Sequence, residues 1–112
     1  GDKLELDESN SALTFEFGTS DFTDSAAAEE SLQQYIDQLV DFPDLHVTIY
    51  GYTDATGSPE VNQKLSEERA ATVGALLESA GVKASQITTE GKGESTSFDT
   101  DEQNRRVEIA FG

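Results

Sequence analysis

The order in which hydrophobic patterns change along the chain constrains its fold most. Short segments with alternating apolar and polar residues are separated by two long segments whose apolar residues recur every three or four positions. Alternation predicts strands, and the longer period predicts helices. The resulting order is strand, strand, helix, strand, helix, strand, strand. Strands separated by helices favour an α+β two-layer sandwich. We expect a mixed β-sheet with two main helices packed on one face and a βαβαββ-like core.

Five segments carry the strand pattern. The clearest is 45–50, where an apolar residue occupies every second position. The polar stretch 7–10 predicts a tight connection between the first two strands. The stretch 91–94, with two glycines, predicts a turn, and we expect a polar, acidic loop over 95–104. The predicted strands are 4–6, 13–17, 45–50, 86–90 and 107–111.

Two segments carry the helical pattern, and capping residues mark their ends. The first helix can be capped by Asp24 or Ser25, and the pair Phe42-Pro43 stops it. The second starts with Ser58 as its cap and Pro59 in its first turn. It runs to about residue 80, just before a glycine that is typical of a helix C-terminus.

The charge of the chain excludes several partners. Asp and Glu number 23 against 7 Lys and Arg, which gives a formal net charge of -16. Nonspecific nucleic-acid binding needs a basic face that neutralises phosphates, so no nucleic-acid partner is expected. The same charge disfavours adhesion to anionic lipid.

The size of the chain suits a single domain over residues 1–112. There is no cysteine, so no disulfide can form. No apolar stretch approaches the ~20 residues of a membrane span. Because the chain begins abruptly at Gly1-Asp2-Lys3, we expect a domain excised from a longer protein. We expect it to be a monomer or a weak dimer.

An acid and an arginine on neighbouring elements form the candidate site. Asp54 lies in the loop after the predicted strand 45–50, and Asn62 and Arg69 share one stripe of the following helix. A carboxylate can hold an ammonium, and a guanidinium can hold a carboxylate in a two-pronged hydrogen bond. Together they would hold a zwitterion, and the backbone amides of Thr53 and Asp54 could also donate to a carboxylate. A plain surface salt bridge between Asp54 and Arg69 is the structural alternative.

The arginines are few and unevenly placed. The only three are Arg69, Arg105 and Arg106. In so acidic a chain they are the natural places to hold a ligand carboxylate, although arginines also serve simply to neutralise nearby acids. If strand alternation extends to the pair, Arg105 shares its side with the helix-covered face and Arg106 points to the other face. On that argument Arg106 is the preferred ligand contact and Arg105 a buried structural partner.

Nothing in the sequence predicts an enzyme or a cofactor. There is no cysteine, and the single histidine, His46, is expected on the open face of the sheet. No motif places a nucleophile beside a base. The group Asp99-x-Asp101-Glu102 could ligate calcium, but it lacks the glycine and spacing of a helix–loop–helix calcium site. A solvated acidic loop is the preferred interpretation, and no metal site is predicted.

A protein-binding surface is the alternative class of function. Tyr50 and Tyr52 alternate on one side of the predicted strand and could contact a protein partner. Tyrosines on strands more often form cross-strand packing. The same scaffold could also bind a free amino acid.

Several motifs together resemble a known family. Residues 13–111 resemble the OmpA-like peptidoglycan-binding domain, which is also found in the peptidoglycan-associated lipoprotein Pal and the flagellar stator protein MotB. The matching pieces follow the family order and nearly its spacing. They are Phe15-Glu16-Phe17-Gly18, Gly51-Tyr52-Thr53-Asp54-x-x-Gly57-Ser58, Asn62-x-x-Leu65-Ser66-x-x-Arg69-Ala70-x-x-Val73, Gly81-Val82, Gly91-x-Gly93-Glu94 and Asn104-Arg105-Arg106-Val107-Glu108-Ile109.

The resemblance implies noncovalent binding of the peptidoglycan stem peptide, usually through its diaminopimelate residue. It implies that Asp54 holds the ammonium of the amino-acid head group and that Arg69 holds the carboxylate. The pocket would be shaped by Asn62, Leu65 and one of the two neighbouring arginines. It further implies a tether in the periplasm or cell envelope, with a parent protein anchored in the outer membrane.

Two departures from the family pattern concern the pocket. The stretch 95–103 is shorter than is common, and it lacks both the usual proline and a further arginine. Gly18 stands where some members carry an acid. Both differences bear on the walls of the expected pocket.

Overall fold

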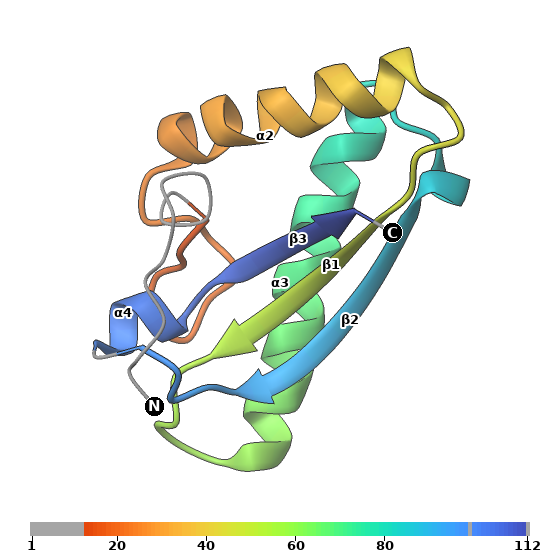
Figure 1. The fold of residues 1–112 in the computed structure, drawn as a ribbon. Coiled ribbons are helices and arrows are strands. Elements are labelled where there is room, and N and C mark those ends of the chain that lie inside the picture. The colour runs from red at the N-terminus through yellow and green to blue at the C-terminus, as the bar shows by residue number, and fades with distance from the viewer. Residues whose placement is uncertain (1–12, 99, 112) are drawn as a thin grey trace.

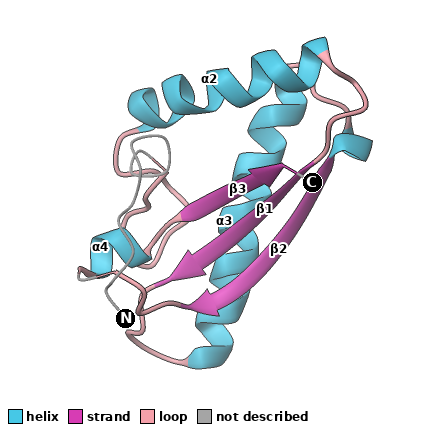
Figure 2. Cartoon of the chain, viewed as in Figure 1, coloured by secondary structure: helices cyan, strands magenta, loops and turns pink. Residues whose placement is uncertain are grey.

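The computed structural model describes residues 13–98 and 100–111. Figure 1 shows the arrangement of the elements and Figure 2 their type. Two long helices and three strands make up most of this part of the chain, with two short helical segments between them. In chain order the elements are α2 (Ser25–Asp41), β1 (Val47–Thr53), α3 (Pro59–Ser79), the 3₁₀-helix η1 (Ala84–Gln86), β2 (Ile87–Glu94), α4 (Asp101–Asn104) and β3 (Val107–Phe111).

The sheet is mixed, as the alternation of strands and helices predicts. Its strand order is β2-β1-β3. β1 lies parallel to β2, which it reaches through the crossover helix α3, and antiparallel to β3. α3 runs behind the sheet and α2 passes across one end of it (Figure 1). The predicted α+β class is confirmed.

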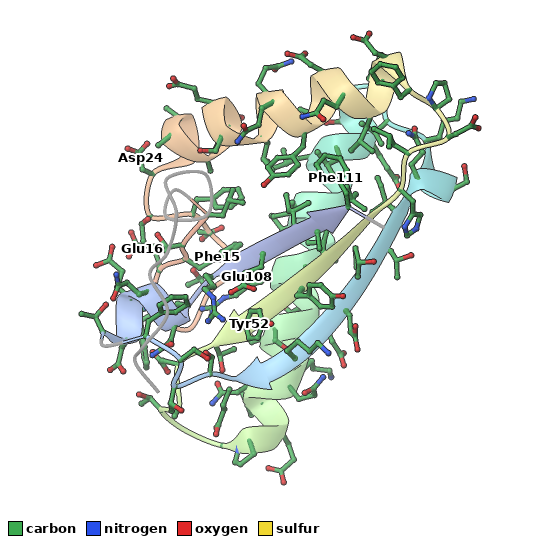
Figure 3. All side chains as sticks on the ribbon, in the orientation of Figure 1. Phe15, Glu16, Asp24, Tyr52, Glu108 and Phe111 are labelled. Carbon is green, nitrogen blue, oxygen red and sulfur yellow. The ribbon has the colours of Figure 1, made fainter. Side chains whose placement is uncertain are left out.

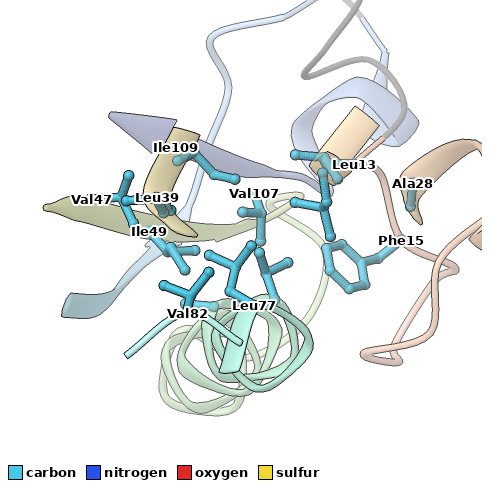
Figure 4. Packing of buried hydrophobic residues seen from close by; sticks show 13 residues of the cluster. Leu13, Phe15, Ala28, Leu39, Val47, Ile49, Leu77, Val82, Val107 and Ile109 are labelled. Atoms are coloured by element: carbon cyan, nitrogen blue, oxygen red, sulfur yellow. The ribbon is translucent and has the colours of Figure 1, made fainter. Parts of the chain in front are cut away.

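The core lies between the sheet and the helices. Val47 and Ile49 of β1 and Val107 of β3 have no exposed surface. They pack in one cluster with Leu77 of α3 and Leu39 of α2 (Figure 4). Buried positions alternate with half-buried ones along the whole of β1. The period of two therefore marks the covered face of this strand correctly.

The helix ends confirm most of the predicted signals, but Ser58, at the N-cap position of α3, makes no side-chain capping hydrogen bond. Asp24 caps α2 by accepting a hydrogen bond from the backbone N–H of Ala27. Pro59 occupies the first position of α3, and Gly81 follows its end with φ +108°. Within the described part of the chain, the helices are too short or too polar to cross a bilayer.

The predicted strand 13–17 is wrong as a continuous element. Thr14 and Phe15 form only isolated bridges, to Arg106 and Phe22 respectively. The segment turns back on itself because Gly18 adopts φ +70°. The predicted strand 4–6 lies outside the described residues.

The predicted turn 91–94 is also wrong, because these residues continue β2. A Cβ on Gly91 would lie 2.7 Å from the backbone nitrogen of Glu67 in α3. The glycine therefore serves the close approach of helix and strand, not chain reversal. Near this end, the register between β1 and β2 shifts between Gly51 and Thr53.

The expected loop over 95–104 contains a short helix. α4 is capped by Thr100, whose hydroxyl accepts a hydrogen bond from the backbone N–H of Gln103. Phe98 is buried beneath this segment. The side chain of Asn104 at the end of α4 accepts a hydrogen bond from the backbone N–H of Phe98 and donates one to its carbonyl, so this buried aromatic residue is tied to the short helix.

Candidate functional site

A pocket of about 400 Å³ opens where the end of β1, the start of α3 and the segment around Phe17 meet. Of the seven residues predicted for the site, the structure places six in its lining and leaves Arg106 outside. The lining residues are Phe17, Gly18, Thr53, Asp54, Thr56, Gly57, Ser58, Val61, Asn62, Lys64, Leu65, Glu68, Arg69 and Arg105.

Asp54 is the buried acid of the pocket. Its Oδ1 accepts a hydrogen bond of 3.0 Å from the backbone N–H of Thr56. Its Oδ2 accepts one of 2.9 Å from Nη1 of Arg105. Burial by itself raises the pKa of Asp54, but these two donors outweigh it and hold the pKa below its ordinary value of 3.8. An ionised carboxylate offers about four acceptor positions, so Asp54 keeps acceptor capacity for a further donor.

Arg69 is a buried cation that has no ion pair among the described residues. Its side chain has no exposed surface. Nε, Nη1 and Nη2 donate to the backbone carbonyls of Thr19, Tyr52 and Glu16 at 2.8 to 3.1 Å. Because a guanidinium carries five N–H groups, two remain beyond these three bonds. Burial lowers the pKa of Arg69 to about 10, so the side chain stays charged at neutral pH.

Arg105, not Arg106, lines the pocket, so the choice of Arg106 as the ligand contact is wrong. The sides that alternation assigned are kept, because Arg106 lies beside Glu108 and Arg105 is the structural partner of Asp54. Arg105 pairs with Asp54, and the two side chains are only 17% and 4% exposed. The surface salt bridge considered between Asp54 and Arg69 is not formed. Arg106 lies on the opposite face of the sheet, where its guanidinium stacks 3.9 Å from the ring centre of Tyr52. Its Nε donates to Glu108, and Figure 3 shows Tyr52 and Glu108 together on that face.

The remaining predicted residues shape the wall of the pocket. Asn62 is buried, and its side-chain amide donates to the carbonyl of Thr56 at 2.9 Å and to Glu94 at 2.8 Å. It thereby ties the loop after β1 to the end of β2. Thr53 is also buried, and Leu65 is half-buried. These contacts fix the backbone that presents Asp54.

The pocket differs in charge from the rest of the chain. Three of the seven Lys and Arg residues line it, but only two of the 23 acids do. The cations are Lys64, Arg69 and Arg105, and the acids are Asp54 and Glu68. The pocket is thus positive by one unit in a chain of net charge -16. Such a local reversal favours an anionic group in the ligand.

The rim of the pocket consists of residues that no sequence motif predicted. Phe17 and Val61 line it with 63% of their surfaces exposed. Lys64 and Glu68 lie nearby on α3 and are also exposed. Val61, Lys64 and Glu68 follow the spacing i, i+3, i+7, which places them on one helix stripe beside that of Asn62 and Arg69. An apolar residue on the solvent side of an otherwise polar helix turn was the signal available for Val61.

The buried ion pair gives stability a defined pH dependence. Since the folded-state pKa of Asp54 is depressed, its contribution is present above the unfolded-state pKa and is lost as pH falls through the folded value. We expect Asp54→Asn to lower the free energy of unfolding by about 1–3 kcal/mol at pH 7. This difference should begin to shrink as pH falls below the ordinary Asp pKa of 3.8 and should vanish once pH lies below the lower folded-state pKa. Urea unfolding of both proteins between pH 2.5 and 7 measures it.

Comparing the two proteins at each pH removes the other acids as a cause, because both share them. A difference in stability that stays constant down to pH 2.5 would contradict the assigned role of the ion pair.

The alternative sites gain no support in the described residues. No group of three or more His, Asp or Glu side chains there is placed to hold a metal ion. Asp99 of the calcium alternative lies outside the described residues. Nε2 of His46 is 2.9 Å from the hydroxyl of Thr88, at the end of the sheet that lies away from the pocket.

Comparisons with known proteins agree with this fold. Residues 14–109 match the OmpA family. The chain is 35% identical to the probable lipoprotein YiaD of Escherichia coli over 99% of this chain and 52% of the relative. It is 38% identical to the peptidoglycan-binding protein ArfA of Mycobacterium tuberculosis over 83% of this chain and 30% of the relative. The chain thus spans about half or less of the length of these relatives.

A solved structure shows the same architecture. The peptidoglycan-associated lipoprotein from Burkholderia pseudomallei matches with a TM-score of 0.80 and 28% identity, over 89% of this chain and 88% of that one. The match to the family covers most of the chain, including every residue of the pocket. By sequence and by fold, the chain belongs to the OmpA family.

Proposed function

We propose that this chain binds peptidoglycan noncovalently, by holding the amino-acid head group of a diaminopimelate-type stem peptide. One observation carries the proposal: a buried acid and two arginines line the same positive pocket in a strongly acidic protein. An amino-acid head group presents an ammonium and a carboxylate a few bonds apart. Charged hydrogen bonds to both groups are stronger than neutral ones.

The existing ion pair suggests how the head group enters. Asp54 and Arg105 are paired at 2.9 Å. A ligand ammonium would bond to Asp54, and a ligand carboxylate would bond to Arg105, so that one internal pair is exchanged for two with the ligand. The positive charge of Arg69, which no acid neutralises by an ion pair, would add to the attraction for the ligand carboxylate. Because Arg69 has no exposed surface, direct contact with its two remaining N–H groups requires the side chains above it to move.

Two relatives support the choice of ligand. The names of ArfA and of the Burkholderia lipoprotein state binding to, or association with, peptidoglycan. Both align with most of this chain. We propose that this chain has the same binding activity and that it binds diaminopimelate-type stem peptides.

As a tether, the domain needs only one weak site. The cell wall is a polymer of repeated stem peptides, and a parent protein held in the envelope would keep the domain at a high effective concentration near it. We therefore place the protein in the cell envelope, with a structural rather than a catalytic role.

Co-sedimentation with purified peptidoglycan tests the proposal. The protein should pellet with diaminopimelate-type sacculi and much less with lysine-type sacculi, because lysine lacks the second head group. Free meso-diaminopimelate should release it. Equal pelleting with both wall types would contradict the diaminopimelate part. Absence of pelleting with either would overturn cell-wall binding and favour a protein or free amino-acid ligand.

A further inference from the structure

The pocket has two tiers that differ in burial. Its floor holds Asp54, Asn62 and Arg69, each at most 5% exposed. Its rim includes Val61 and Lys64, which are exposed. A head group that reaches the floor leaves the rest of the stem peptide at the rim. The rim residues therefore face the part of the ligand that precedes the head group.

Lys64 is the rim residue whose charge is uncommitted. It forms no ion pair with any described residue. Glu68 follows one turn later, but a lysine placed before a glutamate at this spacing is the less favourable order for an ion pair on a helix. The floor and the adjoining Arg105 already supply one acid and two arginines for a zwitterion. Lys64 is therefore available to pair with a second anionic group of the ligand.

We propose that Lys64 binds a second carboxylate of the stem peptide, on the residue next to the amino-acid head group. This inference rests on the proposed function and refines its ligand. In a diaminopimelate-type stem, that neighbour is a glutamate joined through its side chain, so its α-carboxylate is free unless it is amidated. The pocket then prefers unamidated stems. The exposed Phe17 and Val61 at the same rim contact the aliphatic carbons between the two polar groups.

Two peptides that differ by one group test this assignment. They are L-Ala-γ-D-Glu-meso-diaminopimelate and the same peptide with D-isoglutamine, whose α-carboxylate is a carboxamide. By calorimetry, the wild type should bind the acid about two- to fivefold more tightly than the amide, as expected for a partly exposed ion pair. Lys64→Gln should lose this preference by weakening only the acid, and Lys64→Glu should reverse it.

Lys83→Gln is the matched control. It removes the same charge from an exposed lysine beyond the far end of α3, on the order of 20 Å from Lys64 at 1.5 Å rise per residue. It should keep the wild-type preference. Raising the salt concentration to about 0.5 M should shrink the preference, because exposed pairs are screened.

The outcomes separate the two proposals. If the wild type binds the acid and the amide equally well, the role of Lys64 is overturned and the head-group site stands. If Lys64→Gln weakens the binding of both peptides to the same extent, Lys64 does not bind the second carboxylate. If the wild type binds neither peptide, the proposed function fails, and this inference fails with it.

Discussion

Asp54→Asn is expected to raise the dissociation constant for diaminopimelate-type peptidoglycan by about 10- to 150-fold, the equivalent of about 1.5–3 kcal/mol for a hydrogen bond to a charged group. The asparagine keeps the shape of the side chain but cannot pair with an ammonium. Binding isotherms from co-sedimentation with sacculi measure the effect. Circular dichroism establishes that the variant is folded.

The control for this prediction is Asp44→Asn, which makes the same change at an exposed residue outside the pocket. It should bind as the wild type does. A second variant, Arg105→Gln, removes the proposed partner of the ligand carboxylate and should also weaken binding. If the folded Asp54→Asn protein binds with wild-type affinity, Asp54 does not contact the ligand.

Gly51→Ala is expected to lower the free energy of unfolding by at least about 3 kcal/mol, because a side chain there meets helix backbone. A Cβ on this β1 residue would lie 1.9 Å from the carbonyl oxygen of Ser66 in α3. A backbone atom cannot move aside as a flexible side chain can, so the helix and the sheet must separate. The midpoint of thermal unfolding should fall by roughly 10–20 °C for a domain of this size.

Gly74→Ala provides the matched control at the same helix–sheet interface. Its Cβ would meet only side-chain atoms, the nearest being Cγ2 of Thr89 at 3.1 Å. Alanine also favours a helix more than glycine does. We expect a change smaller than about 1 kcal/mol. A Gly51→Ala protein as stable as the wild type would show that α3 does not approach β1 as closely as the structure has it.

Elements with strong local signals were predictable. α2 begins after the capping residue Asp24, and α3 begins at Pro59. In both cases neighbouring residues supply the hydrogen bond or the backbone angle that starts the helix. The floor of the pocket was predictable for the same reason, since Asn62 and Arg69 share a stripe of one regular helix that starts beside Asp54.

Elements that depend on distant partners were not predictable. Residues 91–94 carry two glycines, which locally indicate a turn, yet they continue the pairing of β2 with β1, and Gly91 leaves room for the close approach of α3. Residues 13–17 carry a strand pattern, yet their pairing ends at isolated bridges to Phe22 and Arg106. In both segments the decisive neighbour is a part of the chain outside the local pattern.

The two neighbouring arginines show most clearly where local inference ends. Alternation assigns sides only within a regular strand. Arg105 precedes β3 as the C-terminal cap of α4, with φ -80° and ψ 77°, so the alternation along β3 does not say which distant residue it pairs with. The sequence by itself determined the α+β class, the two long helices and the association of Asp54 with the stripe of Arg69. Only the tertiary structure decided that Arg105 pairs with Asp54 and that Lys64 stands at the rim, because both depend on how segments far apart in the chain pack together.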